Sequence, residues 1–334
     1  RYWRDWSSDV CSSDLVEDVV SIAAAAGAGG SVGIAGSAGV LVADVVTRAF
    51  VGDDPSDATA SLGAGGLHVR GSGQISANDL LDVTNIVGTI SVGGAAGVGA
   101  AVGVPVVTKR VESFVGAGQN LTVDGQSTLD IRTGDFAIGF QNAPEKPGNV
   151  DIQGGHKPTK ADAAFGPPDI GQLTDSDQDG NADGSVDTNH DGVDDRNGEA
   201  MYGGVRVASL ATQGGFSGLS VTATNRDSVK NFAMAAGGAA TAAVSVAAGV
   251  NVFDTTARAY IGNGAVINAD TSGAAAGQSV NLRGSNDFYH LEVAGALAVA
   301  AGAGISPAVG VSVMTMTTEA FIADGATVRA ADDV

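Results

Sequence analysis

The sequence predicts an all-β fold: a right-handed parallel β-helix (solenoid) of about four units with one protruding loop insertion. Three observations predict it. A motif centred on an aromatic residue recurs, long uncharged stretches end in alternating β-branched residues, and glycine contributes 50 of 334 residues, about twice the usual ~7%.

The aromatic motif sets the length of the repeat. Its four copies are TRAFVG (47–52), VESFVG (111–116), ARAYIG (257–262) and TEAFIA (318–323). Their aromatic residues are Phe50, Phe114, Tyr260 and Phe321, spaced 64, 146 and 61 residues apart. The unit is therefore about 62 residues, and the long middle interval contains an insertion. Tandem units favour a solenoid because stacking gives one continuous core that no single unit could bury.

A long uncharged stretch precedes each aromatic residue. The four stretches are Val19–Ala43, Ile86–Val107, Phe232–Phe253 and Val293–Thr318. Each exceeds the ~18 residues of a transmembrane helix, but glycine costs a helix interior ~1 kcal/mol per residue. Alternation such as Val309, Val311, Val313 is typical of strands. We therefore predict strands, with about three coils of ~20 residues in each unit and small residues filling a narrow interior.

Charges alternate beside the aromatic motif. The residue two positions before each ring is Arg48, Glu112, Arg258 or Glu319 in turn. With three coils between copies, these side chains are expected to lie too far apart to pair and to form a solvated edge. A second motif reads LHVR, LDIR and VNLR, and it places Arg70, Arg132 and Arg283 at apparently equivalent positions, which indicates a structural role.

Residues 1–15 stand apart from the rest of the chain. They hold both tryptophans and the single cysteine, Cys11, and they resemble the translated read-through of a sequencing adapter. We expect the natural chain to begin near Val16. The expected organisation is an artefactual tail (1–15), solenoid units one and two (16–133), a loop insertion (134–218), and units three and four (219–334), the last one truncated.

The insertion carries a motif with metal chemistry. The pattern D-x-[DN]-x-D-G occurs twice, starting at Asp175 and at Asp187. Oxygens at loop positions 1, 3 and 5 converge on one hard cation, and the glycine at position 6 permits the sharp turn. Asp187 would close the first loop and open the second. The candidate ligands are Asp175, Asp177, Asp179, Asn181, Asp183, Asp187, Asn189, Asp191, Val193, Asp195 and Glu199. An all-oxygen, carboxylate-rich set favours Ca²⁺; the alternative is an acidic linker that binds no metal.

Other site classes find little support in the sequence. A net charge of −20 opposes nucleic-acid binding, which needs clustered Lys and Arg. One cysteine allows no disulfide framework. The four histidines are scattered, and neither a G-x-S-x-G elbow nor a phosphate loop is present. No catalytic residue and no organic cofactor site is predicted.

The repeats resemble those of a known group. The pattern AGAG…V-x-V…TTEAFIADGATVRA is similar to the β-strand repeats of giant bacterial adhesins, related to filamentous-haemagglutinin-like and autotransporter passenger proteins, over Val16–Arg132 and Leu219–Val334. The tandem acidic loops resemble thrombospondin type-3 calcium repeats. These resemblances imply a fragment of a non-enzymatic, calcium-stabilised adhesin, secreted or at the bacterial surface, which contacts a host-cell or matrix glycan or protein. They imply no nucleic-acid partner and no membrane span. The alternative is a carbohydrate-active β-helix enzyme like the polysaccharide lyases, with acids and a base in a groove.

Overall fold

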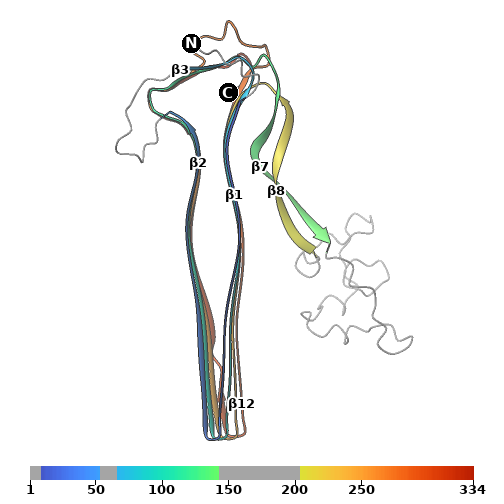
Figure 1. The fold of residues 1–334 in the computed structure, drawn as a ribbon, viewed down its shortest axis with the longest axis vertical. Coiled ribbons are helices and arrows are strands. Elements are labelled where there is room, and N and C mark those ends of the chain that lie inside the picture. The colour runs from blue at the N-terminus through green and yellow to red at the C-terminus, as the bar shows by residue number, and fades with distance from the viewer. Residues whose placement is uncertain (1–8, 53–65, 143–203) are drawn as a thin grey trace, which may run out of the picture. The chain divides into compact units, whose positions relative to one another are not determined.

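The computed structural model describes residues 9–52, 66–142 and 204–334, and within these ranges the chain forms strands and turns but no helix (Figure 1). The strands are β1 (Asp9–Gly29), β2 (Val32–Val51), β3 (Gly66–Val69), β4 (Gly73–Gly93), β5 (Ala96–Val115), β6 (Asn120–Val123), β7 (Leu129–Asn142), β8 (Gly204–Phe216), β9 (Gly218–Ala239), β10 (Ala242–Ile261), β11 (Val266–Ile267), β12 (Ser279–Ala300), β13 (Ala303–Ile305), β14 (Ala308–Ile322) and β15 (Thr327–Val328). In the described part, no helix is long and apolar enough to cross a membrane.

Parallel pairing stacks these strands into a solenoid of four rungs. Each rung contributes one long strand to sheet A (β1-β4-β9-β12), one to sheet B (β2-β5-β10, then β13 and β14) and one short strand to sheet C (β3-β6-β11-β15). Figure 1 shows the long strands of sheets A and B running side by side and joined by tight turns at one end. In the fourth rung Pro307, which has no N–H to donate, separates β13 from β14.

One repeat unit forms one rung, so the prediction of three short coils per unit is wrong. The long strands of the first three rungs span 20–22 residues. Each uncharged stretch folds back at its centre, as at Gly30–Ser31 between β1 and β2. Alternation with period two therefore continues through two long strands. These strands, the short strand of sheet C and the segments that connect them together account for all the residues of one repeat unit. The prediction of strands in place of membrane helices is confirmed.

The aromatic motif aligns across all four rungs. Phe50, Phe114, Tyr260 and Phe321 are register partners in sheet B. Neighbouring rings stack with centroids 4.9, 4.8 and 5.2 Å apart and with interplanar angles of 3–7°. These distances are about one strand spacing, which confirms the repeat alignment read from the sequence.

The alternating charges pair across rungs, contrary to the expectation of a solvated edge. Arg48 Nε lies 2.7 Å from Glu112 Oε2, and Arg258 Nε lies 2.7 Å from Glu319 Oε2. Because adjacent rungs are one strand spacing apart, a residue and its counterpart in the next copy are direct neighbours. The error followed from the wrong number of coils in a unit.

The second motif does not mark equivalent positions. Arg70 follows the short strand β3, whereas Arg283 lies within the long strand β12, opposite Thr222 of β9. Arg132 belongs to β7, outside the three solenoid sheets. The true counterpart of Leu67 is Leu121 in β6. A shared apolar-x-apolar-Arg pattern was insufficient because short and long strands alike show that alternation.

The interior narrows along the rungs toward the turns. Near sheet C the core contains Ile75, Leu121, Leu219 and Ile267. Further along it consists of Leu81, Val83, Val107, Val229 and Phe253, and then of Val87, Ala101, Ala235 and Ala247. Beyond these, the sheets meet backbone to backbone, since a Cβ on Gly97 would lie 2.5 Å from the carbonyl oxygen of Gly238. The buried side chains beside the turns are therefore no larger than that of Thr89, and most belong to glycine, alanine or serine.

A ladder of glycines shows the same narrowing at one register. Gly39, Gly103, Gly249 and Gly310 are partners across sheet B. A Cβ on Gly103 would lie 2.5 Å from Oδ1 of Asn231, and one on Gly249 would lie 2.0 Å from Oε1 of Glu292. Polar side chains of sheet A occupy the space that these glycines leave, which confirms that glycine serves close packing.

The insertion departs from the solenoid between rungs two and three. β7 and β8 pair with each other in a separate two-stranded sheet. The chain divides into one compact unit of Arg1–Phe136 with Leu210–Val334 and another of Ala137–Ser209. The predicted calcium ligands, Asp175 to Glu199, lie outside the described residues, as do residues 1–8 of the tail. Strand β1 begins at Asp9 and pairs with β4 from there.

Candidate functional site

The outer face of sheet A is apolar next to the turns. Four successive rows of outward-facing residues cross its four strands there, and the register partners in each row come from β1, β4, β9 and β12. None of the sixteen is charged or polar. The rows are Ile22, Ile86, Phe232, Val293; Ala24, Gly88, Met234, Gly295; Ala26, Ile90, Ala236, Leu297; and Ala28, Val92, Gly238, Val299. We call this set the sheet A patch.

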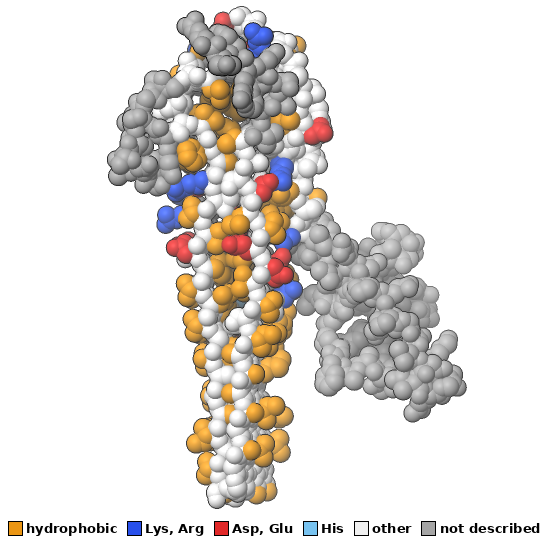
Figure 2. Space-filling model, in the orientation of Figure 1, with side chains coloured by type: hydrophobic (Ala, Val, Ile, Leu, Met, Phe, Trp, Pro, Cys, Tyr) orange, Lys and Arg blue, Asp and Glu red, His pale blue; other side chains and the backbone are white. Residues whose placement is uncertain are grey.

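The large members of the sheet A patch are exposed. Ile22 has 69% of its surface accessible, Ile90 has 59% and Leu297 has 60%. In Figure 2 hydrophobic side chains project from the narrow half of the solenoid, and the charged side chains visible on this face lie in the other half. The larger apolar side chains stand outside because the narrow interior admits only glycine, alanine and similarly small groups.

A shallow apolar groove of about 780 Å³ crosses the sheet A patch. Its lining includes Ala24, Gly88 and Gly295, whose side chains are small or missing, and Met234 of the same row. Ile90 and Leu297 stand along one side. Apolar atoms dominate its lining. A groove of this kind can hold aliphatic or aromatic groups, but it offers no acid or base for chemistry.

Sheet B carries a second apolar outer face. Its outward rows repeat valine in register across the rungs: Val40, Val104, Val250, Val311, and Val42, Val106, Val252, Val313. Val40 and Val42 are 65% and 70% exposed. Both broad faces of the sandwich are thus apolar beside the turns, and charged residues such as Asp44 and Asp254 of β2 and β10 begin where these rows end.

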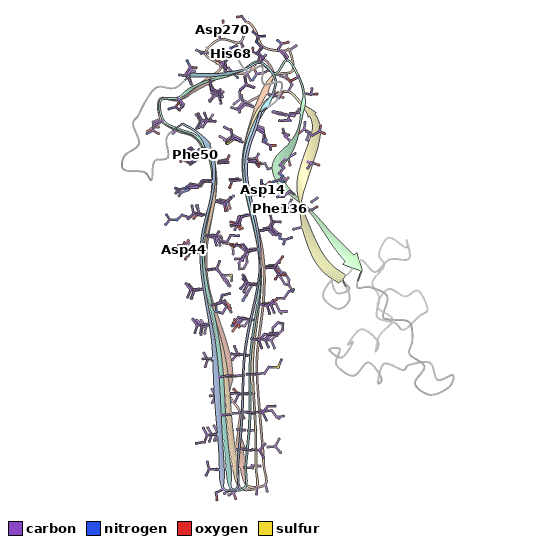
Figure 3. All side chains as sticks on the ribbon, in the orientation of Figure 1. Asp14, Asp44, Phe50, His68, Phe136 and Asp270 are labelled. Carbon is purple, nitrogen blue, oxygen red and sulfur yellow. The ribbon has the colours of Figure 1, made fainter. Side chains whose placement is uncertain are left out.

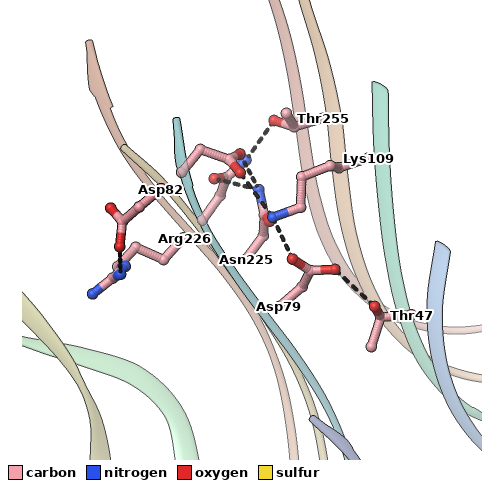
Figure 4. Close-up of polar contacts among 9 residues, drawn as sticks. Thr47, Asp79, Asp82, Lys109, Asn225, Arg226 and Thr255 are labelled. Carbon is pink, nitrogen blue, oxygen red and sulfur yellow. Dashed lines mark hydrogen bonds and ion pairs between the residues drawn. The ribbon is translucent and has the colours of Figure 1, made fainter. Parts of the chain in front are cut away.

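A buried charged cluster occupies the interior further from the turns (Figure 4). The Lys109 ammonium lies 2.5 Å from Asp79 Oδ1 and 2.8 Å from Asp227 Oδ1, and all three side chains are fully buried. The Thr47 hydroxyl donates to Asp79 at 2.7 Å, and the Asn225 amide donates to Asp227 at 2.7 Å. Each buried carboxylate therefore has the Lys109 ammonium at contact distance, which offsets part of the cost of burying its charge.

Burial raises the pKa of Asp227 above its ordinary value. The Lys109 ammonium, as a charge and as a hydrogen-bond donor, and the Asn225 amide oppose this shift, and the charge of Asp79 adds to it. The cluster thus brings two acids and a base together, as acid–base catalysis requires. Its side chains have no exposed surface, however, so a substrate of polymer size cannot reach them. The cluster holds rungs two and three together.

The described histidines serve local contacts. His68 Nε2 lies 2.7 Å from Asp124 Oδ2 near sheet C, and Figure 3 labels His68 and Asp270 at that end of the solenoid. Burial lowers the pKa of His290, and the charge of Glu292 opposes the shift. His290 packs edge-on against Phe253 with ring centroids 5.4 Å apart. Among the described residues, no group of three His, Cys, Asp or Glu could hold a metal ion.

The sequence reasoning missed Lys109, its two aspartates and the apolar patch. Lys109 follows the uncharged stretch and keeps an inward position in the period-two pattern of β5, so counting parity from the buried Val107 would have placed it inside. Parity would also have shown the larger apolar residues outside.

Comparison of the chain with protein-family models, with curated proteins and with solved structures finds no match.

Proposed function

We propose that the chain is a non-enzymatic structural or adhesive solenoid, exported to the bacterial cell surface or secreted, and stabilised by calcium in its insertion. The observation that carries the proposal is the in-register stacking of four near-identical rungs, which produces long, uniform outer faces. A uniform repetitive surface suits extended contact or spacing better than chemistry at one point. Parallel crossovers within one sheet are nearly always right-handed, so right-handed winding is part of the proposal.

The distribution of charge supports a non-catalytic role. In the described part of the chain, several surface charges are tied in ion pairs. Arg226 pairs with Asp82 of the neighbouring rung at 2.7 Å, and Arg283 pairs with Asp135 of β7 at 2.8 Å. The groove is apolar, and the cluster of Lys109 with Asp79 and Asp227 is buried. A polysaccharide lyase would need such a grouping on an open face, so the enzyme is the second candidate.

An adhesion assay separates the two candidates. Beads coated with the full chain should be retained on extracellular-matrix protein or host-cell glycan surfaces more than albumin-coated beads, while acidic polysaccharides incubated with the chain should yield no unsaturated sugar product. Release of such a product would contradict the structural proposal. Retention equal to that of albumin-coated beads would leave no adhesive role and would contradict that part of it.

Calcium binding is tested separately. Calorimetric titration of the full chain should show binding below about 1 mM Ca²⁺, the range of extracellular sites. The double variant Asp179→Asn/Asp191→Asn, which changes one ligand in each loop, should lose most of the heat. The matched control is Asp324→Asn, an acid outside the insertion. No heat from the unmodified chain would contradict calcium stabilisation.

A further inference from the structure

The sheet A patch has the size and uniformity of a protein interface. Four strands ~4.8 Å apart and four rows ~6.6 Å apart cover about 500 Å² per copy. Two such faces in contact bury about 1,000 Å², the lower bound for a specific interface. An apolar patch of this size lies in the upper part of the range of about 300–600 Å² for the largest patch on a monomeric protein, and such patches are often functional.

The patch is complementary to itself. Within each of three strands a large and a small residue stand two positions apart: Ile90 follows Gly88 in β4, Met234 precedes Ala236 in β9, and Leu297 follows Gly295 in β12. A two-fold axis lying between these two rows and parallel to them would place each large side chain of one copy over the small residue of the same strand in the other.

The outer two rows obey the same relation in β1 and β9, whereas β4 brings Ile86 over Val92 and β12 brings Val293 over Val299, apolar residues of similar size. The axis that superposes the inner rows also brings the row of Ile22 and Phe232 over the row of Ala28 and Gly238. Phe232, the largest residue of the patch, then faces Gly238 of its own strand in the second copy. The match of large with small residues, in three strands of the inner rows and two strands of the outer rows, is the pattern expected of an isologous contact, in which one surface meets itself.

We propose that a second copy of this chain covers the sheet A patch, face to face, with Ile90 and Leu297 of each copy seated in the groove over Gly88 and Gly295 of the other. Lipid is the less favoured occupant. The pairs of large and small residues, Ile90 with Gly88 and Leu297 with Gly295, match a rigid apolar surface better than fluid acyl chains, which need no such pattern.

The first test is the mass of the full chain in solution, measured by light scattering up to about 100 μM, where even a contact of micromolar Kd is saturated. The unmodified chain should form dimers. I90K/L297K should lower the measured mass, because the new lysines of the two copies would place positive charges together inside the contact. T84K is the matched control, since Thr84 lies on the same face of β4 beyond the patch. A chain that is monomeric at this concentration would overturn the proposal.

The second test reads the register. Gly88 and Gly295 have open space where a Cβ would lie, so G88I should leave the fold intact but place large on large and weaken association at least tenfold. The exchange G88I/I90G restores a large residue opposite a small one and should recover association. If the exchange associates no better than G88I, this register is wrong. Flotation of monomers with phosphatidylcholine vesicles, abolished by I90K/L297K, would make lipid the occupant and overturn the proposal.

Discussion

Lys109 illustrates how a single buried charge fixes the neighbouring rungs. Its ammonium contacts Asp79 in rung two and Asp227 in rung three, so one side chain of sheet B links two strands of sheet A. Replacing a buried ion cluster by apolar groups can be neutral, but removing one partner leaves uncompensated charge. The cluster therefore specifies which rungs lie together. Losing one of its charges should destabilise the fold more than replacing the whole cluster by apolar residues.

Lys109→Met should lower the free energy of unfolding by about 3–5 kcal/mol, because two carboxylates remain buried without a cation. Chemical denaturation followed by circular dichroism measures the change. Lys230→Met, on the outer side of β9, is the control and should alter stability little. Equal effects of the two substitutions would show that Lys109 does not compensate the aspartates.

Asp227 gives a pH dependence whose sign follows from burial. Because burial raises the pKa of Asp227 in the folded state above its ordinary value, the folded protein binds this proton more tightly than the unfolded chain does. The stabilisation is fully present below the unfolded pKa and is lost as pH rises through the folded pKa. Asp227→Asn should therefore gain stability relative to the unmodified chain as pH rises through that interval. Parallel denaturation curves over pH, with a constant difference, would contradict the raised pKa.

The long strands show which features of the fold can be predicted from the sequence and which cannot. Period-two alternation and the aromatic spacing predicted strands and the number of repeats, and both follow from local chemistry. The number of coils in a unit depended on where a chain of small residues turns, and Gly30–Ser31 differs little from the glycine- and alanine-rich residues around it. The larger apolar residues face outward because the interior is narrow. That narrowness results from the close approach of two sheets, so the sequence of a single strand does not reveal it.

Gly103→Ala tests that close approach. The new Cβ would lie 2.5 Å from Oδ1 of Asn231 and 3.1 Å from Nδ2 of Asn85, so the sheets must separate or the amides must move, at a cost of about 1–3 kcal/mol. Gly36→Ala is the matched control, because Gly36 is exposed on the outer face of the same sheet and a Cβ there would lie 3.9 Å from the nearest atom, the carbonyl oxygen of Ala100. Thermal unfolding should show a lower Tm for the first variant alone. An unchanged Tm for Gly103→Ala would mean that the interior is wider than described.

The insertion and the solenoid depend on different forces. β4 pairs with β9, and β5 with β10, in register across the point where residues 143–203 are inserted, so rungs two and three complete the core directly. The metal motif was readable because its ligands are spaced by one local loop, but all of its residues lie outside the described ranges, and calcium binding stays a prediction. The solenoid core, in contrast, contains no predicted ligand.

Replacing residues 143–203 by a short Gly-Ser linker between β7 and β8 should therefore change the stability of the solenoid by no more than about 1 kcal/mol, since shortening a connection alters chain entropy only slowly. The same variant should lose calcium binding in calorimetry. Its unfolding curve should be unaffected by chelator, whereas the unmodified chain should be stabilised by calcium through mass action. Gly88→Ala, prepared under the same conditions, controls for folding. If it folds normally and the chain without the insertion does not, the insertion supports the rungs and the two parts are not energetically separate.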